Sequence, residues 1–174
     1  MSVIIGVTAS IAIYKTCDLV RNLTKAGIEV KVAMTKNAQK WINPIIFAAL
    51  SEHRVYTGDS HVEEAMPHIE IRQNVDLMIV APATANFIAR AANGMANDII
   101  TTTLLSYDGP KLIAPSMNPH MYSNSIVQEN IFKLKKHGIE ILDPQNGETV
   151  CGDIGLGKMM TTDEIEKIIK TKLA

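Results

Sequence analysis

The sequence predicts one α/β domain over residues 1–174, built on a single doubly wound, Rossmann-like (flavodoxin-like) and mostly parallel sheet with helices on both faces. Two observations predict this fold. Short apolar runs alternate with stretches whose apolar residues recur at helical spacing, a pattern typical of βαβ units. The chain has 174 residues, of which 47% are apolar, so it can bury a core without disulfide or metal staples. No linker, repeat or low-complexity segment divides it.

In the first half, apolar runs bounded by turn residues indicate strands, and apolar residues three or four apart indicate helices. Residues 57–76 contain Gly58, Pro67 and scattered charges, and are expected to form a loop. The expected elements are a strand over Val3–Val7, a helix opened by Ser10 and ended by Gly27, a strand over Glu29–Met34, a turn at Thr35–Asn37, a short helix through Trp41, a helix from Pro44 to Leu50 and a short strand at Val55–Tyr56.

The second half continues the alternation and ends on a capping box, Thr161–Glu164, that opens the last helix. Residues 143–160 carry four glycines and no period, so a long loop is expected there. The other expected elements are a strand over Leu77–Ala81 stopped by Pro82, a helix over Phe87–Ala92, a turn at Asn93-Gly94, a helix over Asp98–Ser106, a turn at Asp108–Pro110, a strand over Lys111–Ala114, a helix capped by Ser123 or Asn124 and running to Lys136, and a strand over Ile139–Leu142.

Charge and composition exclude several classes of protein. The formal net charge is −1 and no Lys/Arg block occurs, so nothing predicts nucleic-acid binding. Apolar runs are far shorter than a membrane span. The two cysteines predict neither a disulfide framework nor a zinc site. Met1–Gly6 leads directly into a strand without a basic leader, so we expect no signal peptide and a cytoplasmic protein.

Two predicted strands end in a proline followed by short polar side chains. Thr84 and Asn86 follow the strand over Leu77–Ala81, beside a helix N-terminus, and Ser116 and Asn118 follow the next strand. In an open α/β sheet, ligands bind at the carboxyl ends of the strands, and a helix N-terminus suits a phosphate or an electron-rich ring. The similar endings favour a shared pocket over two unrelated turns, although Asn118 before Pro119 is also a common turn starter.

The first strand-to-helix turn, Gly6–Ile11, lacks the three glycines of a dinucleotide fingerprint. Met34-Thr35-Lys36, at the end of the second strand, supplies no acid for a ribose hydroxyl, which argues against NAD. A mononucleotide phosphate held by Ser10, Thr35 and backbone amides stays possible. Ser10 alone is better explained as a helix N-cap.

His68 and Cys151 each have two interpretations. His68 is either an ordinary loop residue or a catalytic base whose pKa lies near working pH. Cys151 lies in the glycine-rich stretch Val150–Met159, which is either an incidental loop or a lid whose thiol can release a proton in a closed site.

Together these stretches resemble the homo-oligomeric flavin-containing cysteine decarboxylases. The resemblance extends over nearly the whole chain, from Gly6 to Met160. Its specificity comes from the order and spacing of several motifs, each of them weak alone: Gly6–Lys15, Pro82–Asn86, Gly94–Asp98, Pro115–Asn118, Cys151-Gly152 and Gly155–Met159.

The resemblance implies a set of site residues. His68 would be the essential base, Asn118 would hold the substrate carboxylate, and Cys151 would donate a proton from a clamp that closes over the substrate. Lys158 and Met159 would also contact the substrate. The cofactor FMN would lie at a subunit boundary of a trimer, possibly within a dodecamer, near Ala9, Ser10, Ile11, Thr35, Asn37, Thr84, Ala85, Asn86 and Ser116.

The implied reaction converts 4'-phosphopantothenoylcysteine to 4'-phosphopantetheine in coenzyme A biosynthesis. A simple carboxylate has no electron sink, so flavin oxidation of the cysteinyl thiol to a thioaldehyde would activate it for loss of CO2. Return of hydride to the enethiol, with a proton from Cys151, would complete the cycle. The chain leaves no room for the synthetase domain often fused downstream, so a stand-alone decarboxylase is expected.

The sequence departs from the family at Ala9, usually glycine, at Tyr122, usually tryptophan, and at Lys158, usually arginine. Lys158 keeps the charge without the bidentate geometry of arginine. Three alternatives remain within this fold: a peptidyl-cysteine decarboxylase, which stops at the enethiol, a flavin prenyltransferase, and a non-catalytic flavin-binding regulator of a phosphatase. The Cys151 stretch argues against the first, and the combination of His68, Asn118 and Cys151 argues against the others.

Overall fold

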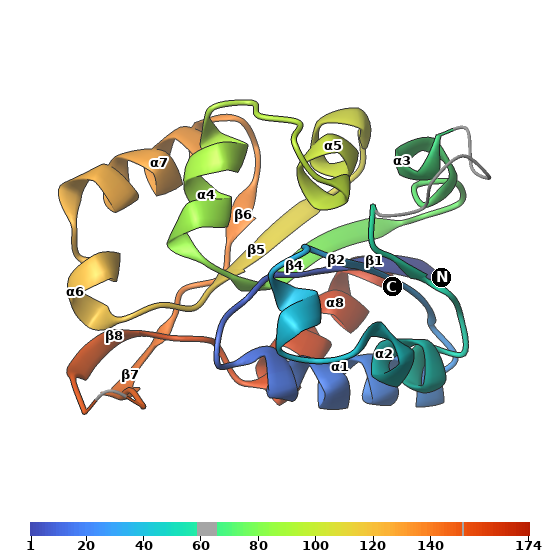
Figure 1. The fold of residues 1–174 in the computed structure, drawn as a ribbon, viewed down its shortest axis with the longest axis horizontal. Helices are drawn as coiled ribbons and strands as arrows, with labels where there is room; N and C mark the ends of the chain where they lie inside the picture. The colour runs from blue at the N-terminus through green and yellow to red at the C-terminus, as the bar shows by residue number, and fades with distance from the viewer. Residues whose placement is uncertain (59–65, 151) are drawn as a thin grey trace.

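The computed structural model describes residues 1–58, 66–150 and 152–174, and its centre is a six-stranded sheet in which every pair of neighbours is parallel (Figure 1). The strand order is β3-β2-β1-β4-β5-β6, so the direction of winding reverses between β1 and β4. Without the two-residue edge strand β3, this is the flavodoxin order. The strands are β1 (Ser2–Val7), β2 (Glu29–Met34), β3 (Val55–Tyr56), β4 (Leu77–Ala83), β5 (Lys111–Pro115) and β6 (Glu140–Ile141).

Helices cover both faces of the sheet, as the doubly wound prediction requires (Figure 1). Alternate strand residues point to opposite faces, so Val3 and Ile5 belong to one apolar core and Ile4 to the other. The first core is covered by α1 (Ile13–Lys25), α2 (Pro44–Ser51) and α8 (Thr162–Leu173), and the second is covered by α4 (Ala85–Ala92), α5 (Ile99–Ser106) and α7 (Ser125–Lys136). The short helix α3 (Pro67–Glu70) packs against α5, and Ile71 directly after it is buried in the second core.

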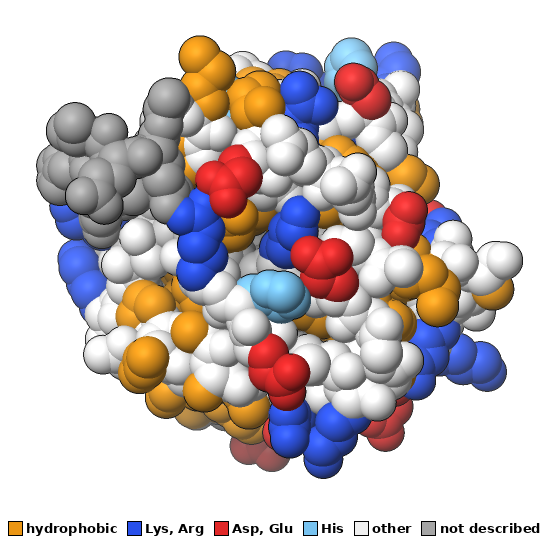
Figure 2. Space-filling view, turned by 90° about the vertical axis from the view of Figure 1, so that its right-hand side faces the viewer, with side chains coloured by type: hydrophobic (Ala, Val, Ile, Leu, Met, Phe, Trp, Pro, Cys, Tyr) orange, Lys and Arg blue, Asp and Glu red, His pale blue; other side chains and the backbone are white. Residues whose placement is uncertain are grey.

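The short elements α6 (Pro119–Tyr122) and η1 (Ala38–Lys40) follow β5 and β2. Both ends of the chain lie at the side of the molecule opposite α6 (Figure 1). Figure 2 shows that on this opposite face Lys, Arg, Asp and Glu side chains are interspersed, with hydrophobic side chains gathered toward the lower left. Among the described residues, no helix is long and apolar enough to cross a membrane.

Pro82 does not stop its strand, which corrects the prediction for Leu77–Ala81: β4 continues through it to Ala83. The pairing of β4 with β5 shifts register between Val80 and Ala83, so the missing N–H of Pro82 falls where the ladder is interrupted. The Pro82 carbonyl oxygen accepts hydrogen bonds from the Thr8 backbone N–H at 3.3 Å and from Thr8 Oγ1 at 2.8 Å. The carboxyl ends of β1 and β4 are therefore tied together.

The long loop expected over residues 143–160 is instead an antiparallel hairpin of β7 (Gln145–Glu148) and β8 (Ile154–Lys158). A Cβ at Gly157 would lie 2.3 Å from the Met117 carbonyl oxygen, and one at Gly155 would lie 2.8 Å from Pro119 Cβ. These glycines therefore let β8 lie against α6 and the segment before it. The turn between the hairpin strands contains Cys151, which lies outside the described residues.

Two further expectations need correction. The predicted loop over residues 57–76 contains the helical turn α3, which Pro67 opens at its first position. Helix α1 begins at Ile13 with Ala12 as its N-cap, so Ser10 is not a helix cap. The Ser10 hydroxyl lies 2.8 Å from the Ser116 hydroxyl instead, and both side chains are buried.

Candidate functional site

Three cavities lie along the carboxyl edge of the sheet, where the turns after β1, β2, β4 and β5 meet. The Asn118 cavity, about 470 Å³, is lined by Ile11, Ala12, Tyr14, Lys15, Ser116, Met117, Asn118, Glu148, Thr149, Val150, Gly157, Lys158 and Met159. The Thr35 cavity, about 440 Å³, is lined by Thr8, Ala9, Thr35, Lys36, Asn37, Thr84, Asn86, Arg90, Asn97 and Asp98. The His68 cavity, about 320 Å³, is lined by Lys36, Thr57, Gly58, Pro67, His68, Ala96, Asn97, Asp98, Ile99 and Thr102.

The turn after β1 separates the Asn118 cavity from the Thr35 cavity. Thr8 and Ala9 line the Thr35 cavity, and Ile11 and Ala12 line the Asn118 cavity. Ser10 lies between them and is joined to Ser116 through its hydroxyl. The structure thus brings the first strand-to-helix turn to the end of β5. The pocket expected to be shared by the ends of β4 and β5 is instead divided, because Thr84 and Asn86 line the Thr35 cavity and Ser116 and Asn118 line the Asn118 cavity.

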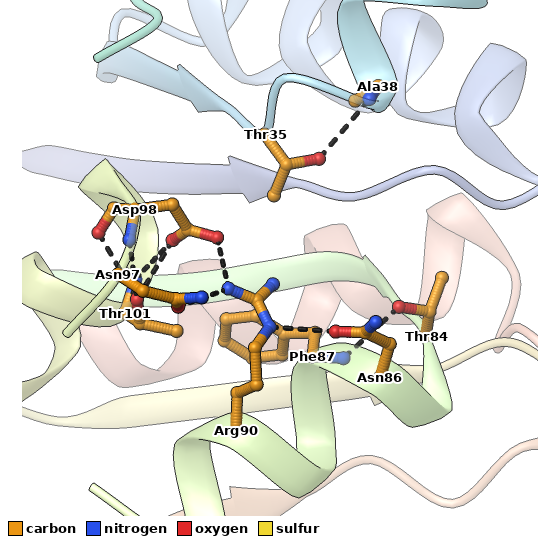
Figure 3. Close-up of polar contacts among 9 residues, drawn as sticks. All are labelled: Thr35, Ala38, Thr84, Asn86, Phe87, Arg90, Asn97, Asp98 and Thr101. Carbon is orange, nitrogen blue, oxygen red and sulfur yellow. Dashed lines mark hydrogen bonds and ion pairs between the residues drawn. The ribbon is translucent and has the colours of Figure 1, made fainter. Parts of the chain in front are cut away.

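The Thr35 cavity collects polar side chains from three strand ends. Thr35 Oγ1 accepts a hydrogen bond from the Ala38 N–H at 3.2 Å, which orders the start of η1. Thr84 is the N-cap of α4, and its Oγ1 accepts from the Phe87 N–H at 3.3 Å. Figure 3 shows both threonines with Asn86, which lies in the first turn of α4. Ala85 begins α4 but does not line this cavity.

Arg90, Asn97 and Asp98 also line the Thr35 cavity, and they were not among the predicted site residues. Arg90 Nε donates to Asn86 Oδ1 at 2.7 Å, and Nη1 donates to Asn97 Oδ1 at 2.6 Å and to Asp98 Oδ2 at 2.5 Å (Figure 3). The available signal was the motif Gly94–Asp98, which supported the family resemblance without a role for its last two side chains.

Asn118 is the N-cap of α6, and Pro119 is the first residue of that helix. Asn118 Oδ1 accepts from the His120 N–H at 2.9 Å, while Nδ2 donates to Asp153 Oδ2 at 2.5 Å. Asn118 therefore lies at a turn, as its position before Pro119 predicts, and its side chain also lines the Asn118 cavity. Lys158, the last residue of the hairpin, lines the same cavity, and so does the buried Met159 that follows it.

His68 lies on α3 and lines a different cavity from Asn118. The His68 cavity adjoins the Thr35 cavity, since Lys36, Asn97 and Asp98 line both. Glu70, on the same helical turn as His68, accepts a hydrogen bond from Tyr56 Oη at 3.2 Å and pairs with Arg54. Burial raises the pKa of Tyr56, so its hydroxyl keeps its proton for this bond.

The wall of the Thr35 cavity holds mostly uncharged hydroxyl and amide groups beside a few charged side chains, whereas the wall of the Asn118 cavity is mainly apolar and includes the polar side chains of Ser116, Asn118 and Thr149. Hydroxyls and amides can hold a polar heterocycle or a phosphate without a buried charge of their own. A parallel sheet with such cavities at the switch point of its winding defines an α/β protein that binds a nucleotide-like cofactor.

The chain belongs to the flavoprotein family, whose model matches residues 1–174. A curated relative, the coenzyme A biosynthesis bifunctional protein CoaBC of Vibrio vulnificus, is 44% identical over 160 residues, which are 91% of this chain and 40% of that protein. The chain thus spans about two fifths of the length of such relatives.

Two solved structures share the fold over almost all of both chains. The FMN-dependent cysteine decarboxylase SpaF is 28% identical, with a TM-score of 0.83 over 100% of this chain and 98% of that one. A PPC decarboxylase complexed with pantothenoylaminoethenethiol is 24% identical, with a TM-score of 0.87 over 98% of this chain and 96% of that one. The second likeness concerns the fold alone.

Proposed function

We propose that this protein is an FMN-dependent decarboxylase that converts 4'-phosphopantothenoylcysteine to 4'-phosphopantetheine in coenzyme A biosynthesis. The similarity to CoaBC supports the pathway, and the similarity to SpaF supports FMN and a cysteine-derived carboxylate. The observation that carries the proposal is that the turn after β1 contacts both neighbouring strand ends at the switch point of a flavoprotein sheet, through the bonds of Ser10 with Ser116 and of Thr8 with Thr84.

The residues at the carboxyl edge fit FMN. Asn86 Nδ2 has no hydrogen-bond partner within residues 1–58, 66–150 and 152–174, and Asn86 lines the Thr35 cavity. The buried hydroxyls of Ser10 and Ser116 are bonded to each other, so one of them donates to the other and a single hydroxyl proton of the pair is left for an oxygen or nitrogen of a ligand. The proposed FMN contacts are Ala9, Ser10, Ile11, Thr35, Asn37, Thr84, Ala85, Asn86 and Ser116.

FMN, when bound, supplies a reversible two-electron oxidation, which turns the cysteinyl thiol into a thioaldehyde and gives the departing carboxylate its electron sink. The chain's own residues bind and move protons. Asn118 orients the substrate carboxylate through Nδ2 without adding a charge that would hold it back. His68 takes the thiol proton as the base, and Cys151 returns a proton to carbon. Lys158 and Met159 contact the substrate from the hairpin.

A site that uses both His68 and Asn118 needs two chains in this proposal, because the two side chains line separate cavities of one chain. Ile11 and Tyr14 border the Asn118 cavity with 54% and 59% of their surface exposed, which suits burial against another copy. The assembly proposed is a homo-oligomer built from trimers, either a single trimer or a dodecamer, in the cytoplasm.

Product analysis by mass spectrometry tests the proposal. The protein loaded with FMN is expected to convert 4'-phosphopantothenoylcysteine to a product lighter by one CO2 and fully reduced. H68N should abolish turnover while FMN stays bound, and C151S should stop at the enethiol. Failure of the wild-type protein to release CO2 from this substrate would contradict the proposal. Release only from a peptide with a C-terminal cysteine, stopping at the enethiol, would favour the peptidyl-cysteine alternative.

A further inference from the structure

Arg90 hydrogen-bonds the side-chain amide of Asn86, which lines the Thr35 cavity at the start of α4. Its side chain is 19% exposed, and its Nε donates to Asn86 Oδ1 at 2.7 Å (Figure 3). Asn86 and Arg90 are four residues apart on one helix, so their side chains lie on the same helical face. The contact joins a residue proposed to touch the cofactor to one without a role so far.

The guanidinium group is itself fixed from the next helix. Nη1 donates to Asp98 Oδ2 at 2.5 Å and to Asn97 Oδ1 at 2.6 Å. Asp98 cannot turn away freely, because it is the N-cap of α5 and its Oδ1 accepts from the Thr101 N–H at 2.8 Å. Arg90 therefore presents its Nε in a defined direction.

This arrangement determines which end of the Asn86 amide faces the ligand. An amide side chain has a carbonyl and an NH2 group of almost equal size, so packing alone barely distinguishes its two orientations. Arginine can only donate, so Asn86 must turn Oδ1 toward it. The amide nitrogen then lies on the side of Thr84 (Figure 3), without a hydrogen-bond partner among the described residues.

We propose that Arg90 is a positioning residue that locks the Asn86 amide with its N–H donor presented to an acceptor atom of the bound flavin. The inference rests on the proposed function, because the ligand is the flavin of that same site. Thr84 adds a second donor there, since its Oγ1 accepts from the Phe87 N–H and its own hydroxyl proton is left for a ligand.

A double-mutant cycle on flavin affinity tests this role. Dissociation constants for FMN would be measured by fluorescence titration of wild type, R90M, N86A and R90M/N86A. Losing one neutral hydrogen bond should weaken binding about fivefold in each single variant. Because Arg90 acts through Asn86, the factor by which R90M weakens FMN binding should be at least about threefold smaller in the N86A background than in wild type. Additive effects would overturn the inference.

N86D supplies a second test that does not require removing Arg90. Its carboxylate keeps an acceptor for Arg90, so the thermal midpoint of the apoprotein should not fall, but it has no N–H to give the flavin. Riboflavin is the probe here, because it carries no phosphate for the new carboxylate to repel. Riboflavin affinity should fall about fivefold. Unchanged affinity for riboflavin would overturn the inference.

K133M is the matched control, because it also removes a cation that hydrogen-bonds an asparagine: Lys133 Nζ donates at 3.3 Å to Oδ1 of Asn93, just beyond the other end of α4. Lys133 lines none of the three cavities. Its FMN affinity should equal that of wild type. Wild-type protein that binds neither FMN nor riboflavin would overturn the proposed function together with this inference. Wild-type protein that binds FMN, with an additive cycle, would overturn the inference alone.

Discussion

Asn118 Nδ2 donates a hydrogen bond to Asp153 Oδ2 over 2.5 Å, so the amide proposed to hold the substrate carboxylate already holds a carboxylate of its own chain. Asp153 lies directly before β8, and Asn118 is the N-cap of α6. The bond therefore joins the hairpin to the end of β5 at the mouth of the Asn118 cavity. The amide nitrogen is therefore directed toward a carboxylate oxygen.

Replacing Asp153 should strengthen substrate binding. In D153A the substrate carboxylate no longer competes with an internal one for Asn118 Nδ2, so KM should fall about threefold to tenfold. Steady-state kinetics of the FMN-loaded enzyme measure this. D143A is the control, because Asp143 makes an exposed ion pair with Lys135 at 3.9 Å. A higher KM in D153A would mean that Asp153 positions the amide instead of competing for it.

Gly157 should tolerate no side chain. A Cβ there would lie 2.3 Å from the Met117 carbonyl oxygen, which belongs to the backbone and cannot move aside alone. G157A should lower the free energy of unfolding by about 1–3 kcal/mol, as overpacking does, and should weaken substrate binding. Denaturant titration measures the first effect. G147A is the matched control in the same hairpin, where the nearest atom is the flexible Lys158 Cδ at 3.6 Å. Equal stability of the two variants would contradict this packing.

Glu70 should matter to catalysis through the placement of α3. Tyr56 and Arg54 both hold its carboxylate, and His68 lies on the same helical turn. E70A should lower kcat about twofold to fivefold, with little change in stability, because the pair is largely exposed. E52A removes another exposed carboxylate, paired with Arg21 at 3.6 Å, and should leave kcat unchanged. If E70A and E52A have the same kcat, the contacts of Glu70 do not position His68.

Loss of the Tyr107 hydroxyl proton should lower the free energy of unfolding in strong alkali. Burial, aided by the nearby Asp76 carboxylate, raises the pKa of Tyr107 from 10.0 to about 12, and its hydroxyl donates to the Val75 carbonyl at 3.1 Å. The unfolded chain loses this proton near pH 10 and the folded chain near pH 12. The stabilisation is therefore complete below pH 10 and is lost as the pH rises toward 12. Y107F should show a shallower fall of unfolding free energy over this interval, measured by urea titration; an unchanged slope would contradict the assignment.

The sequence was most informative about the regular elements. β1 and β2 were predicted within a residue of their bounds. β1 is buried on both faces, which needs the continuous apolar run from Val3, whereas in β2 the apolar residues are buried and Glu29 and Lys31 are not. The hairpin of β7 and β8 was missed because its strands are rich in polar residues and glycine, and two of these glycines serve packing against α6. Strand propensity does not record such contacts.

The candidate site was predicted in part. Thr84, Asn86, Ser116 and Asn118 could be selected because each follows a predicted strand at the ligand-binding edge. Arg90 could not, since its role depends on Asp98 reaching it from the next helix, eight residues away. Nothing in the sequence indicated that His68 and Asn118 line separate cavities, because this depends on the packing of α3 against α5.

Mixing two inactive variants tests most directly the claim that one reaction uses His68 and Asn118 of different chains. H68N and N118A would each be purified inactive, dissociated, mixed in equal amounts and reassembled with FMN. Suppose that each site takes His68 from one chain and Asn118 from its neighbour in a closed ring. Each of these residues is native in half of the chains, so about a quarter of the sites in the mixture hold both native residues. The account predicts that decarboxylation returns to about that fraction of the wild-type rate. A mixture as inactive as its components, although shown to contain both variants in one assembly, would contradict it.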